Sequence, residues 1–230
     1  MKSKLTLSKI VLIFVMLYYS PFPSKGTASA TGWRETTPTI GYFTNPLVVS
    51  TSNRIYALTG NSYDYESYDM ATINSDGTLS PWIAIYYGGV LSTNESPGVL
   101  VNGIIYHPGG RANGGNLSDA VVSITIDSSG FFGTYTLQPY LNRHRGLHTC
   151  LYSNGYLYVI GGYTSIFNPF ETISPTNSVE YSKINPDGSL LGWQFTSSLS
   201  IDSGKMMGGW VSNGYLNVLS STGNIECALQ

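Results

Sequence analysis

The feature that most constrains the fold of this chain is a strand, tight turn and strand pattern that occurs four times. Its clearest copy is Cys150 to Tyr163, CLYSNGYLYVIGGY, in which Asn154-Gly155 is a dipeptide that favours a two-residue type I′ hairpin. Tyr156 to Ile160 then alternates aromatic and aliphatic residues at the period of a β-strand, and Gly161-Gly162 ends that strand. The stretch therefore predicts two antiparallel strands joined by a tight turn.

Three further copies align with this stretch: NRIYALTG from Asn53, NGIIYHPGG from Asn102 and a degraded NGYLNVLSS from Asn213. An aromatic residue precedes each copy at a nearly fixed distance. In sequence numbering the separations are 23, 24, 23 and 24, for Trp33 to Tyr56, Trp82 to Tyr106, Tyr135 to Tyr158 and Trp193 to Asn217. Successive aromatic residues of this series follow one another at intervals of 49, 53 and 58 in the same numbering. Spacing this regular indicates a repeat architecture.

Each of the first three copies is also followed by a second tight turn, always five residues before the next aromatic residue. These turns are Asp76-Gly77, Ser129-Gly130 and Asp187-Gly188. One repeat therefore reads as four short antiparallel strands, a to d, exemplified by Leu147 to Ser153, Tyr156 to Ile160, Asn177 to Ile184 and Leu190 to Thr196. Four such strands in about 50 residues are typical of a β-propeller blade.

These elements carry a family resemblance. Arg145-x-x-His148, then Asn154-Gly155-x-Leu157-Tyr158-x-x-Gly161-Gly162, then Asp187-Gly188-x-Leu190 and Trp193 resemble the kelch repeat of secreted bacterial propellers. The resemblance covers nearly all of residues 31–230, with repeats starting near Trp33, Trp82, Tyr135 and Trp193. It implies an all-β, kelch-type propeller, and the number of repeats indicates about four blades, whereas kelch rings usually have five to seven. It implies no single activity, because function depends on sites added to a fold.

The two ends of the repeat region are complementary. Trp33 holds a strand d position with no strands a to c before it, while Ile225 to Ala228 resembles Val179 to Ser182 of strand c. The N-terminal strand could close the last blade beside Ile225 to Leu229, which would remove an exposed sheet edge. The alternative is an open partial ring, a fragment of a larger propeller.

Residues 1–30 read as a signal peptide. Lys2, Lys4 and Lys9 precede an apolar run from Ile10 to Tyr19, and Ala28-Ser29-Ala30 fits a cleavage site. An uncleaved anchor is the alternative, although a spanning helix needs about 20 apolar residues. Cleavage after Ala30 removes four of the eleven basic residues and no acidic one, leaving 7 minus 13, a net charge of −6. We expect a secreted or periplasmic protein without stable membrane insertion and without a nucleic-acid partner.

Strand order divides the connections between two faces. The tight turns share one face, and the a-to-b turns keep a fixed length. The other face holds the variable b-to-c loops, Asn61 to Ser67, Arg111 to Leu117 and Tyr163 to Thr176, and the d-to-a segment with Arg143 and His144. Because variable loops on a rigid scaffold usually carry binding, we expect the ligand on this face. The candidate ligand-binding residues are Tyr63, Tyr65, Arg111, Arg143, His144 and Phe167.

Several of these features also have a purely structural interpretation. Tyrosines beside Asp64 and Glu66 suit sugar stacking, but they also suit a solvated turn. Arg145 and His148 fit a structural role where strand a begins. Extended residues 144 and 148 would lie about 13 Å apart, so no histidine metal site is expected, and neither is a cofactor. Cys150 and Cys227 are expected to be free, buried thiols rather than a disulfide.

The sequence favours a non-catalytic binding module for a carbohydrate or an extracellular protein. The nucleophile-elbow motif of hydrolases is absent, and the Asp-box spacing of sialidases is not matched by NSDGTLSPW, residues 74–82. A carbohydrate-active enzyme that uses Glu66 and Glu171 stays open as an alternative, because sequence does not give the separation of two carboxylates. A truncated propeller without a function of its own is the other alternative.

Overall fold

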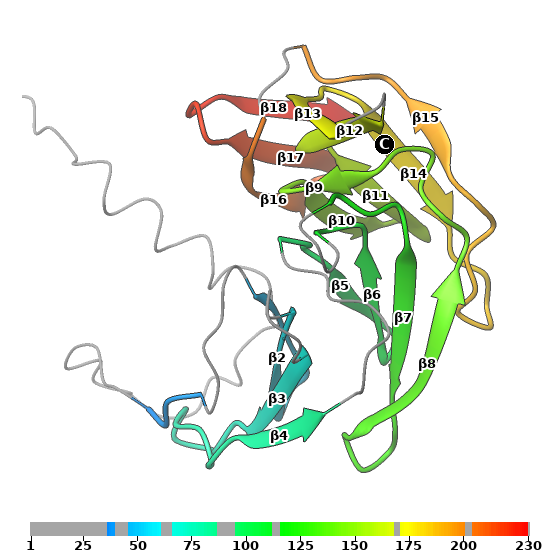
Figure 1. The fold of residues 1–230 in the computed structure, drawn as a ribbon. Helices are drawn as coiled ribbons and strands as arrows, with labels where there is room; N and C mark the ends of the chain where they lie inside the picture. The colour runs from blue at the N-terminus through cyan, green and yellow to red at the C-terminus, as the bar shows by residue number, and fades with distance from the viewer. Residues whose placement is uncertain are drawn as a thin grey trace, which may run out of the picture. The chain divides into compact units, whose positions relative to one another are not determined.

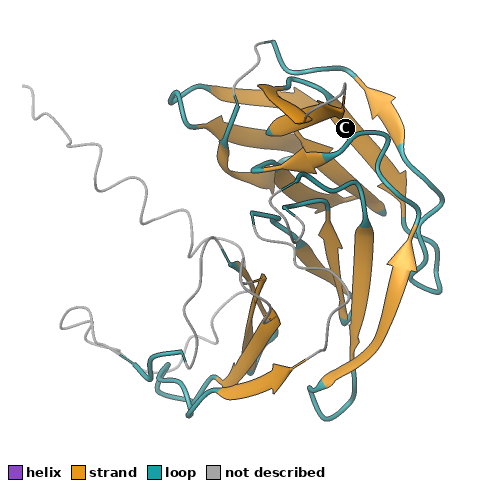
Figure 2. Cartoon of the chain, viewed as in Figure 1, coloured by secondary structure: helices purple, strands orange, loops and turns teal. Residues whose placement is uncertain are grey.

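The computed structural model describes residues 36–39, 46–60, 66–86, 95–111, 116–167, 171–200 and 204–229 (Figure 1). Every regular element in these ranges is a β-strand, as the colouring in Figure 2 makes plain. The signal-peptide assignment, Trp33, Tyr63 and Tyr65 fall outside the described residues.

Four antiparallel sheets follow one another along the chain. The first contains β1 (Leu47–Ser50), β2 (Arg54–Gly60), β3 (Glu66–Thr72) and β4 (Ile83–Tyr86), and the second contains β5 (Val99–Val101), β6 (Ile104–Pro108), β7 (Val121–Ile126) and β8 (Phe132–Gln138). The third contains β10 (Thr149–Ser153), β11 (Tyr156–Ile160), β14 (Val179–Lys183) and β15 (Gln194–Thr196), and the fourth contains β16 (Met206–Ser212), β17 (Tyr215–Ser220) and β18 (Ile225–Leu229). The order a-b-c-d predicted for one repeat is confirmed in the first three sheets.

The Asn-Gly turns have the backbone that the sequence predicts. Asn154 and Gly155 have φ values of 49° and 83°, and the Asn102-Gly103 and Asn213-Gly214 turns repeat this pair of positive angles. Two consecutive residues with positive φ define the type I′ turn, whose twist matches that of the strands it joins. These turns fix the register, so that Ser153 lies opposite Tyr156 in the third sheet.

The double glycine at the end of strand b serves close packing as well as backbone conformation. Gly161 and Gly162 have φ values of 64° and 88°. A Cβ atom on Gly162 would lie 2.5 Å from the carbonyl oxygen of Gly146, and one on Gly161 would lie 2.8 Å from the sulfur of Met206. Both positions therefore need glycine, because a side chain would collide with the start of strand a in the same or the next sheet.

Apolar clusters join each sheet to the next. Tyr56 and Phe132 belong to the cluster between the first and second sheets, and their rings meet edge to face with centroids 5.3 Å apart. Tyr106 and Trp193 share the cluster between the second and third sheets, and Ile160 and Leu216 share that between the third and fourth. The apolar core thus lies between the sheets, because each repeat buries its apolar face only against the neighbouring repeat.

Two polar contacts recur between neighbouring sheets. The strand b tyrosine donates its hydroxyl to the glycine carbonyl of the next sheet's second turn: Tyr56 to Gly130 at 2.9 Å, and Tyr106 to Gly188 at 2.7 Å. The indole of Trp193 donates to the carbonyl of Pro139, which follows strand d of the second sheet, at 2.9 Å. These bonds explain why the aromatic residues keep their spacing from the turns.

Two expectations need correction. The b-to-c segment of the third repeat is not a loop: β12 (Tyr163–Phe167) and β13 (Glu171–Pro175) form a hairpin, and β12 also pairs with β9 (Arg145–Gly146). The hairpin forms because the inserted segment supplies enough residues for two strands that pair with each other. The cysteines are free as expected, but Cys227 is exposed because it lies on β18, a strand with only β17 beside it in the described residues.

Candidate functional site

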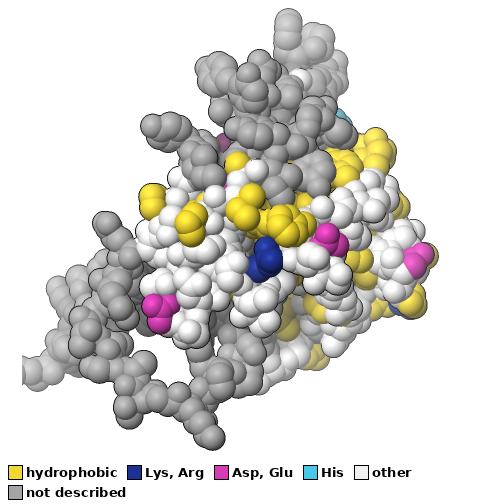
Figure 3. Space-filling view, turned by 90° about the horizontal axis from the view of Figure 1, so that it is seen from below, with side chains coloured by type: hydrophobic (Ala, Val, Ile, Leu, Met, Phe, Trp, Pro, Cys, Tyr) yellow, Lys and Arg dark blue, Asp and Glu magenta, His cyan; other side chains and the backbone are white. Residues whose placement is uncertain are grey.

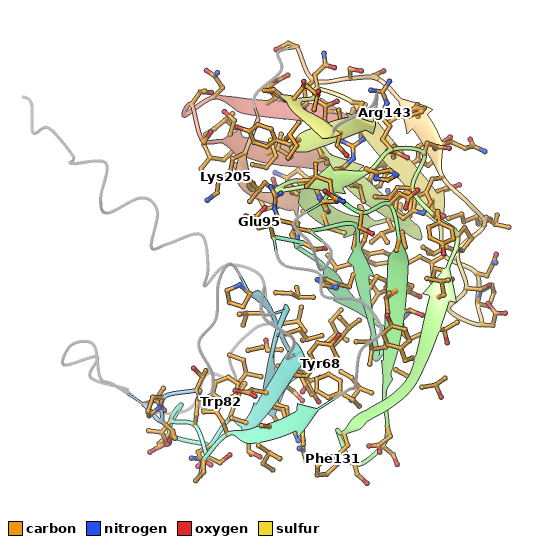
Figure 4. All side chains as sticks on the ribbon, in the orientation of Figure 1. Tyr68, Trp82, Glu95, Phe131, Arg143 and Lys205 are labelled. Atoms are coloured by element: carbon orange, nitrogen blue, oxygen red, sulfur yellow. The ribbon has the colours of Figure 1, made fainter. Side chains whose placement is uncertain are left out.

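The residues just before the first strand of each sheet meet around one pocket of about 300 Å³, which we call the strand-entry pocket. Its lining comes from all four sheets: Pro46, Glu95, Ser96, Pro97, Leu147, His148, Lys205 and Met206. Figure 4 shows Glu95 and Lys205 side by side where β5 and β16 begin. The pocket therefore lies at the strand a entry, on the face that holds the d-to-a connections.

Backbone hydrogen bonds hold the rim of this pocket together. The amide of Leu147 donates to the carbonyl of Glu95, and the amide of Met206 donates to the carbonyl of Leu147, both at 2.9 Å. Glu95 and Leu147 have φ values of 63° and 53°, a left-handed conformation that is uncommon outside glycine. The second and third repeats thus share an uncommon backbone conformation at the same position, which directs the start of strand a in both.

One ion pair lies at the pocket edge. The guanidinium Nε of Arg111 is 3.1 Å from the Glu95 carboxylate, and both side chains are partly exposed. Lys205, from the fourth sheet, is also partly exposed and belongs to the same lining. The pocket lining thus offers a carboxylate and an ammonium group to a polar ligand, and the Arg111 guanidinium lies beside the carboxylate.

His148 and Ser96 are the buried polar residues of the lining, and His148 is the titratable one. It is 3% exposed, and in the described residues neither ring nitrogen has a hydrogen-bond partner of good geometry. Burial lowers the pKa of His148 well below its ordinary value, and the charges of Arg145 and His107 lower it further, while the carbonyl of Pro108 offsets this only in part. The imidazole is therefore neutral near pH 7, with one donor and one acceptor nitrogen.

A buried ion pair supports the floor of this region. Arg145 and Glu180 are both fully buried, with 2.8 Å between Nη2 and the carboxylate. Arg145 also donates to the carbonyl of Gly161 at 2.7 Å and to the hydroxyl of Ser178 at 2.7 Å. The second carboxylate oxygen of Glu180 accepts the amide of Asn142 at 2.7 Å. This network fixes the d-to-a segment against strands b and c.

The predicted ligand-binding side chains that the structure describes do not meet in one site. Arg111 joins the strand-entry pocket through Glu95. His144 bonds the carbonyl of Leu117 through Nδ1 at 2.9 Å, and its Nε2 is 3.6 Å from Asp119. Arg143 is exposed and stacks over the ring of Phe195 at 5.5 Å, and Figure 4 shows it away from Glu95 and Lys205.

The side chain of Phe167 lies outside the described residues, as do Tyr63 and Tyr65. The Glu66 and Glu171 side chains that an enzyme would need also lie outside them. In the described part of the chain, no three His, Cys, Asp or Glu side chains gather closely enough to hold a metal ion. No helix in the described ranges is long and apolar enough to cross a membrane.

Sequence reasoning missed the strand-entry pocket, although the repeat held a signal for it. Glu95 precedes Tyr106 by 11 positions, and Leu147 precedes Tyr158 by 11. Lys205 precedes Asn217 by 12, with the extra position at the register shift between Met206 and Gly208. Extending the repeat alignment toward the N-terminus would have placed these three residues together.

Charged side chains are sparse on the described surface. On the face drawn in Figure 3, hydrophobic side chains gather in patches, while the few acidic and basic side chains are scattered. Lys, Arg, Asp and Glu together make up 10% of the sequence. No basic stripe of the kind that neutralises phosphates appears on the described part of this face.

Comparison with known proteins identifies the repeat. Residues 144–181 match the model of the Kelch motif. A solved structure titled "Structure of YjhT" superposes with a TM-score of 0.59 and 11% sequence identity, covering 84% of this chain and 67% of that chain. No curated protein sequence matches. Because the identity is so low, the structural likeness concerns the fold alone.

Proposed function

We propose that this kelch-repeat β-propeller is a secreted, non-catalytic protein that recognises a carbohydrate or an extracellular protein. The kelch fold supports this proposal, because it is the fold of a binding module. The observation that carries this proposal is the strand-entry pocket, where three successive repeats contribute polar or ionisable side chains and the first repeat contributes Pro46. The ligand group that enters it would be small and polar.

The chemistry of the pocket supports such a ligand. The carboxylate of Glu95 accepts hydrogen bonds, and the ammonium group of Lys205 donates them. A volume of about 300 Å³ is at the lower end of ligand sites, which suits one terminal sugar or one polar side chain of a protein loop.

Arg143, which lies away from this pocket, and Phe167 would contact another part of a larger ligand. Arg143 already lies over an aromatic ring, and arginine beside aromatic side chains is a common anchor of binding sites. Arg143→Ala and Phe167→Ala are therefore expected to weaken binding about tenfold or more, since truncating an anchor costs roughly 2 kcal/mol. Neither substitution is expected to lower the unfolding midpoint, because Arg143 is exposed and Phe167 lies in the inserted hairpin.

The test is a glycan array together with a pull-down from extracellular material, both with the chain from Thr31. A hit is then titrated against Lys205→Ala and against Lys183→Ala, an exposed lysine at the other end of strand c. We expect Lys205→Ala to weaken binding tenfold or more, with no change for Lys183→Ala. Equal affinities for both variants and the parent would refute the pocket as the binding site.

A further inference from the structure

A second concave surface lies between the third and fourth sheets, away from the strand-entry pocket. This groove of about 280 Å³ is lined on one side by Tyr158, Val179 and Leu199 and on the other by strands β17 and β18, including Cys227. Strand β18 has only β17 as a partner in the described residues, and its end residues Ile225 and Leu229 are 59% and 71% exposed. The groove thus borders a sheet edge that no other described strand covers.

The repeat identifies what fills the same groove one blade earlier. Tyr158, Val179 and Leu199 are the repeat equivalents of Tyr106, Val121 and Leu141. Those three residues of the second repeat pack in one apolar cluster with Leu190 and Trp193, which lie at the start of strand d in the third repeat. The open groove is therefore the seat of a strand d tryptophan.

The residues on the N-terminal side of the first sheet make the hydrogen bonds that are typical of the end of a strand d. Thr36 and Thr37 make the contacts that end a strand d elsewhere. The hydroxyl of Thr36 accepts the amide of Leu79 at 2.8 Å, as the Gln138 side chain accepts the amide of Leu190 at 2.9 Å.

The second contact repeats in the same way. The carbonyl of Thr37 accepts the indole N–H of Trp82 at 2.8 Å, as Pro139 accepts that of Trp193 at 2.9 Å. Trp33 precedes Thr37 by four residues, as Tyr135 precedes Pro139. By sequence spacing, Trp33 is therefore the equivalent of the strand d residue Tyr135.

We propose that the groove of one molecule binds residues 31–35 of a second copy of this chain, with Trp33 in the position that Trp193 has against the second sheet. A second copy is favoured because the apolar clusters of the described residues join the first sheet to the second, the second to the third and the third to the fourth, and none joins the fourth to the first. The contact is heterologous, so copies associate head to tail.

The register gives a covalent test. Gln194 lies opposite Tyr181 in the third sheet, and their repeat equivalents are Arg34 and Cys227. Opposed residues of antiparallel strands have Cβ atoms about 4.5–5.5 Å apart, close to the separation that a disulfide spans. Arg34→Cys should therefore form a disulfide with Cys227 of another molecule under mild oxidation, and a non-reducing gel should show covalent dimers and higher species.

Controls make the result specific. Glu35→Cys places its thiol opposite Glu226, on the other face of the sheet, and should give at least tenfold less cross-linked product. Cys227→Ser in the Arg34→Cys background should abolish the product, while buried Cys150 should take no part. A monomer with an internal disulfide would show that the segment closes its own chain, and it would overturn the proposal, as would equal cross-linking by the two cysteine variants.

A second measurement requires no cysteine. Sedimentation velocity should show association of the unmodified chain from Thr31 that rises with concentration and weakens tenfold or more in Trp33→Ala. Trp210→Ala in strand β16 is the matched control, because it also removes one indole but lies outside the groove lining. A concentration-independent monomer, or equal weakening by both substitutions, would overturn the proposal.

Discussion

Substitution of Arg145 tests whether the d-to-a segment depends on its buried ion pair. Arg145→Met leaves the carboxylate of Glu180 without a counter-charge at a position with no exposed surface. Breaking a buried pair in this way costs about 3–5 kcal/mol. With a urea dependence of about 2 kcal/mol/M, the unfolding midpoint should fall by about 1.5–2.5 M.

The double variant Arg145→Met, Glu180→Gln separates the charge effect from lost packing. A glutamine oxygen still accepts the amide of Asn142, so the main remaining defect is the loss of donors to Gly161 and Ser178, about 1–3 kcal/mol. The double variant should therefore be about 2 kcal/mol more stable than Arg145→Met alone. If it is less stable than the single variant, the destabilisation does not come from an unpaired charge.

Three further predictions concern buried and turn positions. Burial lowers the pKa of His107 to about 4, below its unfolded value of about 6.5. The stability that neutral His107 contributes is therefore complete above pH 6.5 and is lost as pH falls toward 4, at most about 1.4 kcal/mol per pH unit. Between pH 7 and 4.5 the urea midpoint should fall less in His107→Gln than in the parent. In thermal unfolding Gly162→Ala should cost roughly 2 kcal/mol more than Gly155→Ala, the usual scale of an overpacked site. Both glycines have positive φ, but only Gly162 would bring a Cβ within 2.5 Å of a backbone oxygen. Iodoacetamide should label the native chain once, at exposed Cys227, because burial raises the pKa of the Cys150 thiol; mass spectrometry of two labels would contradict this.

The strands were predictable because their signals are local. Asn154-Gly155 determines a turn whatever surrounds it, and alternation in Tyr156 to Ile160 determines a strand. The β12–β13 hairpin was harder to predict, because Tyr163 to Pro175 contains no Asn-Gly or Asp-Gly dipeptide and its strands are stabilised by pairing with each other and with Arg145-Gly146.

The candidate site was less predictable than the fold. The loop face and Arg111 could be chosen from the variation in loop length, since insertions concentrate there. Glu95 and Lys205 could not be chosen by residue type, because each is a single charged residue 110 positions from the other. Only the convergence of strand entries brings them to one pocket. A site built from one residue per repeat is recognised from equivalent positions, not from a motif.

The tyrosine bonds between sheets have a consequence for synthesis on the ribosome. Tyr56 donates to Gly130, 74 residues downstream, and Tyr106 donates to Gly188, 82 residues downstream. At about 5–20 residues per second, each buried hydroxyl waits roughly 4–16 seconds for its acceptor to be translated. During that interval the newest blade has an open flank, with a tyrosine and apolar side chains that only the following blade covers. A nascent chain of this protein therefore exposes the apolar flank of its newest blade, and the exposed flank moves along the sequence as translation proceeds. This flank is where a holdase chaperone would bind.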